Sequence, residues 1–233
     1  MSAVSETSWT ALAERLEAAL RLEHEPIAIA FGSDPPRGAR GAPRAVPTGC
    51  CLWADAATTS FTTTAGDHAN CSVGSYTHGL LALREAATRD DTQALLASGW
   101  VAKADLAAMP AVDGAPRHVS YGPLREAPFL PDVVLLRLPP GALMTLHSAC
   151  PELALAGKPQ CQIIPRAREQ GALVASLGCS VSRARTGLPA SEMTCALPAC
   201  DLAAIVERLE RGARADEIVA GFARADREQF ASR

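Results

Sequence analysis

Apolar residues recur along the chain with two different periods, and each period predicts one kind of element. Segment 8–22 predicts a helix, because its leucines recur four residues apart on one face and Ser8 is a good helix cap. Helical spacing also predicts helices at 76–87, 90–97, 103–109, 139–155, 201–211 and 216–230, with a helical turn at 50–57. Short apolar or β-branched runs predict strands at 27–31, 58–64, 117–121, 132–138, 173–177 and 192–197, with another beginning at Ile163.

Strands and helices interleave from one end of the chain to the other, which predicts an α/β or α+β fold. A chain of 233 residues is long enough for one large domain with a substantial core. We expect a single domain over 1–233, built on one mixed sheet with flanking helices and loops that carry cysteines. The helices of segment 201–233 are expected to form a tail packed on that domain.

Composition narrows the classes of function. The net charge of −3, without a basic stripe, argues against a nucleic-acid partner. No stretch approaches the roughly 20 apolar residues of a membrane span, and the first residues lack the pattern of a signal peptide. We therefore expect a cytoplasmic protein, in which eight cysteines are buried, metal-binding or redox thiols and not a disulfide framework.

Four of the cysteines lie in loop-like segments close to glycine or proline, at Cys51, Cys71, Cys161 and Cys179. A thiol at the tip of a turn is well placed to bind a ligand, and a set of four thiolates favours an iron–sulfur cluster or zinc. Neither half of the set has the Cys-x-x-Cys spacing of common metal sites. Spacing alone therefore leaves four unrelated buried thiols as an equal alternative. We call this set the four loop cysteines.

The remaining cysteines are poorer candidates. Cys150 falls in a predicted helix and Cys195 in a predicted strand, where thiols usually fill the core. Cys200 precedes a helix but stands alone. Cys50 directly precedes Cys51, and because adjacent residues rarely both reach one metal, the sequence leaves open which of the two is the ligand.

A competing pattern lies at Cys179–Thr186, which has the Cys-x5-Arg-Thr spacing of thiol phosphatases and arsenate reductases. In such a loop the Cys179 thiolate attacks phosphorus and Arg185 holds the oxyanion. The segment lacks the internal glycine that this tight loop usually needs, and Gly187 and Pro189 interrupt the helix that should follow. In a milder form of this hypothesis, Arg183 or Arg185 binds an anion or neutralises a cluster.

Two histidines flank Cys71 in the sequence. His68 and His78 are chemically suited to bind a metal or to move protons. The simpler interpretation, which we favour, is an exposed turn for His68 and a helix face for His78. The chain contains no glycine-rich nucleotide-binding motif, so a nucleotide cofactor is not indicated.

Several short motifs follow one another along the chain in a specific order. They are Glu25–Phe31, Cys51 followed by Ala54, Cys71 with Gly74 and Gly79, Pro131–Val134, Cys161, and Ser176 to Cys179 followed by Arg183. This order resembles the prokaryotic family called domain of unknown function 169. The resemblance extends from about Leu12 to Leu209 and supplies no established activity. It implies that the four loop cysteines are the recurrent cysteines of the family.

Together with this resemblance, the loop cysteines predict an iron–sulfur protein with a 4Fe-4S cluster, and zinc is the second choice. Backbone N–H groups near Gly74 and Gly178 are expected to donate to the sulfurs, and Arg183 to offset the cluster's charge. Such a protein transfers electrons, senses redox state or performs a cluster-dependent step on a small molecule. Its partner is then a redox protein or a small-molecule substrate. The sequence leaves open whether it is an enzyme or a homo-oligomer.

Overall fold

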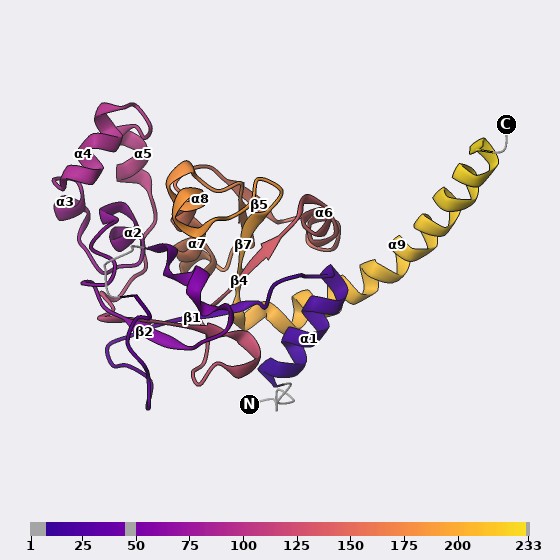
Figure 1. Cartoon of the computed structure of the whole chain (residues 1–233), viewed down its shortest axis with the longest axis horizontal. Coiled ribbons are helices and arrows are strands. Elements are labelled where there is room, and N and C mark those ends of the chain that lie inside the picture. The colour runs from indigo at the N-terminus through magenta and orange to yellow at the C-terminus, as the bar shows by residue number, and fades with distance from the viewer. Residues whose placement is uncertain (1–7, 45–49, 232–233) are drawn as a thin grey trace.

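The computed structural model describes residues 8–44 and 50–231 (Figure 1). Within these residues, one seven-stranded sheet has the order β2-β3-β1-β4-β7-β6-β5. Neighbouring strands are antiparallel except β5 and β6, which are parallel, so the predicted single mixed sheet and α/β class are confirmed. The strands are β1 Ile27–Gly32, β2 Phe61–Thr63, β3 His118–Pro123, β4 Val133–Leu138, β5 Ala154–Ala156, β6 Val174–Ser176 and β7 Met193–Pro198.

Helices cover both faces of this sheet. The α-helices are α1 Trp9–Leu20, α2 Ser72–Thr77, α3 Leu83–Ala86, α4 Asp90–Ala97, α5 Lys103–Ala108, α6 Pro140–Ala149, α7 Ile163–Gln170, α8 Ser180–Thr186 and α9 Leu202–Ala231. Four 3₁₀ helices are also present in the described part of the chain, at η1 Cys50–Ala57, η2 Leu124–Glu126, η3 Gln160–Gln162 and η4 Ala199–Asp201.

The two faces of the sheet bury separate apolar cores, because successive strand residues point to opposite sides. Ala28, Val134 and Leu136 pack against α1, α6 and the first part of α9. Ile29 and Leu135 point the other way, toward η1 and α7. A third, smaller cluster joins α2, α4 and α5 to η1 and η3. In Figure 1, α2 to α5 lie together, away from α1 and α9.

Three local predictions are wrong. The helix predicted over 76–87 is divided into the end of α2 and the separate helix α3, because Gly79 has a φ of +71° that ends α2. The helix predicted over 139–155 ends at Ala149, because Pro151 cannot continue it, and the edge strand β5 follows. Ile163 begins helix α7 and not a strand. Its burial beside Ile164 and Ala167 shows helical spacing, which a short apolar run does not distinguish from a strand pattern.

The C-terminal tail also differs from the prediction. Residues 202–231 form one continuous helix, α9, instead of two helices. Gly212 lies near the predicted break but a single glycine weakens a helix by only about 1 kcal/mol. The buried side chains of α9 end at Leu209, and beyond it the helix extends away from the body (Figure 1). Only the first part of the tail therefore packs on the domain. No helix in the described ranges is long and apolar enough to cross a membrane.

Candidate functional site

The four loop cysteines line a single pocket between the sheet and the α2–α5 group. Cys51 comes from η1, Cys71 precedes α2, Cys161 lies in η3 and Cys179 precedes α8. The pocket is assembled by tertiary packing, since η3 packs against α2 and α8 packs against η1. The structure therefore brings together, from four separate segments, the side chains that the sequence singled out.

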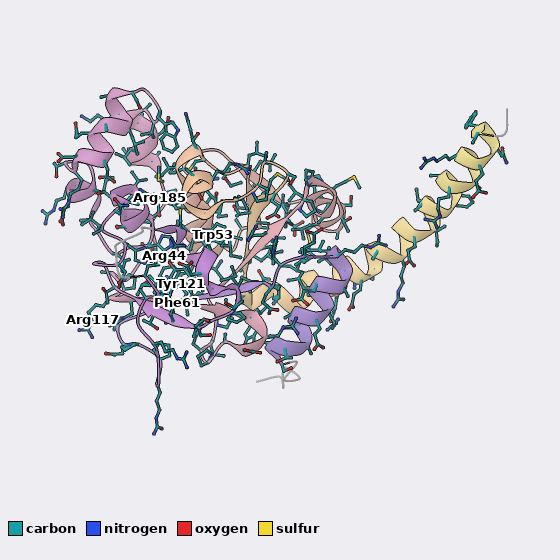
Figure 2. The ribbon with its side chains drawn as sticks, in the orientation of Figure 1. Arg44, Trp53, Phe61, Arg117, Tyr121 and Arg185 are labelled. Carbon is teal, nitrogen blue, oxygen red and sulfur yellow. The ribbon has the colours of Figure 1, made fainter. Side chains whose placement is uncertain are left out.

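Most of the remaining lining is apolar. Trp53 and Trp100 contribute indole rings, and Figure 2 shows Trp53 below Arg185, which lines the pocket from α8. The cavity has a volume of about 50 Å³, room for only a few water-sized groups at about 10–15 Å³ each. The other lining residues are Val73, His78, Leu95, Leu135, Pro159, Gln160, Ile163, Ile164, Val181 and Ser182.

The spacing of the donors distinguishes a single ion from a cluster. In residues 8–44 and 50–231, no three His, Cys, Asp or Glu side chains are grouped closely enough to hold a metal ion. One tetrahedral zinc, with Zn–S bonds of about 2.3 Å, needs its sulfurs about 3.8 Å apart. In a cube each thiolate binds its own iron, so the sulfurs are farther apart. Among the described residues, the donors are therefore not spaced as a ready-made site for a single ion.

Two backbone N–H groups hold the sulfur of Cys179. The Ser182 N–H donates to Sγ at 3.4 Å, and the Gln160 N–H donates to the same atom. Burial nevertheless raises the pKa of the Cys179 thiol, and the neighbouring Cys161 and Cys51 raise it further. The pocket therefore keeps this thiol protonated unless a bound cation compensates for its negative charge.

This raised pKa gives a testable expectation for metal-free protein. Because only the thiolate reacts, Cys179 should be alkylated by iodoacetamide more slowly than a small free thiol at pH 8, and its rate should still increase above pH 9. Mass spectrometry of the peptide that contains Cys179, with glutathione as the reference thiol, measures this profile. Rapid alkylation at pH 7 would contradict the protonated state.

The hydrogen-bond donors predicted at Gly74 and Gly178 are not the ones that the structure records at Cys179. The Gly178 N–H donates to Ser176 Oγ at 3.1 Å. Gly74 lies in α2, where its carbonyl accepts bonds from Thr77 and His78. Gly178 has a backbone role, since its φ of 83° favours glycine, and an added Cβ would also displace the Arg183 Nε that lies 3.0 Å from it. Sequence reasoning missed Gln160 and Ser182, because it did not predict the η3 turn that brings Gln160 beside Cys179.

Arg185 lines the pocket and Arg183, which was expected to offset a cluster's charge, does not. The Arg183 guanidinium donates to four backbone carbonyls and so holds together the loops around α8. It is not part of the pocket wall and is therefore not placed to offset the charge of a cluster. Arg185 lines the pocket and donates to the carbonyl of Asn70, just before Cys71. The carbonyls bonded to Arg183 belong to Leu177, Leu188, Pro189 and Glu192.

The thiol-phosphatase interpretation does not fit the geometry of α8. Segment 180–186 is a helix, and the Arg183 N–H donates to the Cys179 carbonyl. The Ser182 N–H donates to Cys179 Sγ, and the N–H groups from Arg183 onward are used inside the helix, so most of this segment does not form the oxyanion-binding loop of those enzymes. The raised pKa of Cys179 also argues against a nucleophile, which needs a lowered one.

Both histidines near Cys71 are buried, so the exposed position predicted for His68 is wrong, although His68 does lie in a turn and His78 caps the end of α2. His78 lines the pocket, and its Nδ1 lies 3.0 Å from the Gly74 carbonyl, which only accepts, so Nδ1 carries the proton and Nε2 a lone pair. Burial lowers the pKa of His78 to about 4. The His68 ring lies 5.5 Å away and bonds to Thr63. The spacing in the sequence could have indicated that His78 lies near Cys71, because residues seven apart repeat one face of a helix.

The fold and the pocket define an α/β protein with a small, partly buried cavity lined by cysteines. The chain belongs to the DUF169 family, described as "Uncharacterised ArCR", whose model matches residues 15–208. This match confirms the resemblance found in the sequence and includes all four loop cysteines. It ends where α9 begins to leave the body. No curated protein and no solved structure matches the chain.

Proposed function

We propose that this protein binds a 4Fe-4S cluster through Cys51, Cys71, Cys161 and Cys179. The observation that carries the proposal is their meeting in one partly buried pocket from four distant segments. The three remaining described cysteines lie elsewhere: Cys150 and Cys195 in the core on the opposite face of the sheet, and Cys200 at the surface.

The surroundings of the pocket suit such a cluster. A cube held by four thiolates carries net negative charge, which is costly to bury without compensation. Arg185 in the wall and the N–H groups of Gln160 and Ser182 at Cys179 supply positive charge and dipoles. Hydrogen bonds to cluster sulfurs raise the reduction potential, and an apolar wall limits access of water.

The lining of the pocket favours electron transfer or redox sensing over a reaction on a bound substrate. A substrate site needs several convergent polar groups, whereas the pocket wall outside the four thiols is mostly apolar. The partner that fits this role is therefore a redox protein. We place the protein in the cytoplasm as part of the same proposal, because reduced thiols are needed for assembly of the cluster.

Anaerobic purification from iron-supplemented cells tests the proposal. We expect brown protein with broad visible absorption, and about four iron and four acid-labile sulfide per chain. Reduction with dithionite should bleach the absorption and produce an electron paramagnetic resonance signal. Colourless protein without iron, prepared in this way, would refute the cluster. One zinc per chain in place of iron would favour the alternative of a structural zinc site.

A further inference from the structure

The outer part of α9 carries large apolar side chains that nothing covers within the described chain. Ile218 and Val219 are each 64% exposed, Phe222 is 69% exposed and Phe230 is 73% exposed. Monomeric proteins rarely expose apolar groups that are clustered in this way. Helices gain most of their stability from packing an apolar face, so a projecting segment of this kind indicates a missing partner.

The exposed residues form a stripe along one side of the helix. At about 100° per residue, positions 215, 218, 222 and 225 fall within an arc of about 80°. These positions hold alanine, isoleucine, phenylalanine and alanine, and Val219 borders them. A stripe of this width matches the seam between two packed helices.

The charges beside the stripe identify what covers it. Arg211 and Arg214 lie at its N-terminal end, whereas Asp226 and Glu228 lie at its C-terminal end. Arg227 also lies near that end, but its position falls on the opposite side of the helix. Two copies side by side in the same direction would place like charges together. Two copies in opposite directions place each basic end beside an acidic end, so the segment is complementary to itself.

We propose that α9 is a dimerisation helix, which pairs antiparallel with α9 of a second copy of this chain. The two-fold axis passes at the height of Ala220 along the helix. Ile218 of each copy then lies opposite Phe222 of the other, and the small Ala215 and Ala225 meet beyond them. Arg214 then lies within two residues, about 3 Å along the axis, of Glu228 of the second copy. Both fall on the same side of the stripe, where antiparallel helices face each other.

A groove beside α9 is a binding position for Phe230, the last exposed aromatic residue of the helix. It has a volume of about 1010 Å³ and is lined by the end of α1, the start of α6 and residues 213–224 of α9. In the proposed register, Phe230 of the second copy reaches the level of Glu210, near the inner end of this groove. Met144 of α6 lines the groove and is 67% exposed there, and a thioether packs well against an aromatic ring.

The oligomeric state of the full chain tests the proposal independently of any cluster. Sedimentation velocity and light scattering should show a dimer at micromolar concentration, and Phe222→Glu should convert it to a monomer. Ile218→Glu repeats this test on the other half of the central contact. A dimer with a dissociation constant of about 100 µM or tighter would form at a protein concentration of about 100 µM. A wild-type chain that stays monomeric up to that concentration would therefore overturn the proposal. A dimer that survives both substitutions would overturn it as well.

A charge exchange tests the direction of pairing. Arg214→Glu and Glu228→Arg should each weaken the dimer about tenfold, because symmetry places each pair in the interface twice. The double variant should recover the wild-type dissociation constant. Arg227→Glu makes the same change in charge as Arg214→Glu on the opposite side of the helix and should leave the constant unchanged. Failure of the double variant to recover, or an equal effect of Arg227→Glu, would exclude the antiparallel register.

Discussion

Replacing Cys71 by serine should reduce the iron content from about four atoms per chain to less than about one, with parallel loss of acid-labile sulfide. Serine keeps the size of the side chain but does not supply the soft thiolate that iron–sulfur clusters require. The helix that follows should stay in place, because Ser72 donates from N and Oγ to Asp91 at 2.8 and 2.7 Å. Loss of iron would then report a lost ligand and not an unfolded site.

Two other cysteines provide matched controls for Cys71→Ser. Cys200→Ser changes an exposed thiol outside the pocket and should keep the wild-type iron content. Cys150→Ala changes a buried thiol on the opposite face of the sheet and should also change the iron content little. Full iron content in Cys71→Ser would remove this residue from the ligand set. A large loss in a folded Cys150→Ala variant would show that the wrong thiols were chosen.

A second large effect is expected from Gly79→Ala, just after α2. The φ of Gly79 is +71°, which costs an alanine about 1–2 kcal/mol. The new Cβ would also lie 2.4 Å from the backbone oxygen of Val112 and 2.9 Å from Pro116 Cδ, and overpacking adds about 1–3 kcal/mol. We therefore expect a loss of about 2–5 kcal/mol in the free energy of unfolding, measured by urea denaturation. Because Cys71 directly precedes α2, iron content should fall too.

Gly99→Ala is the control that separates the two causes. Gly99 has a similar φ of +68°, but no atom lies within 4 Å of an added Cβ. This variant should lose only the conformational part, about 1–2 kcal/mol. If both variants lost the same amount, the close packing of Gly79 on Val112 would be of no consequence and our account of that turn would be wrong.

Much of the architecture follows from local patterns in the sequence. The run Val133–Leu136 in β4 is apolar because both faces of the sheet are covered there, and this continuous run predicted a central strand. Helix α1 was predicted for a similar reason, from leucines on one face and a cap at Ser8 that the structure shows bonded to the Ala11 N–H. Predictions failed where one short pattern fits two structures, as at Ile163, or where a proline ended a helix early, as at Pro151.

The sequence by itself determined which side chains are chemically suited to a cluster. Thiols next to glycine and proline at element ends are visible as a local pattern, and this pattern selected the four loop cysteines. The tertiary structure alone decided that they line one pocket, that Arg185 and not Arg183 faces it, and that His78 joins them. The physical reason is that these contacts join residues far apart in the chain, whose distances depend on how helices pack on the sheet and not on any local periodicity.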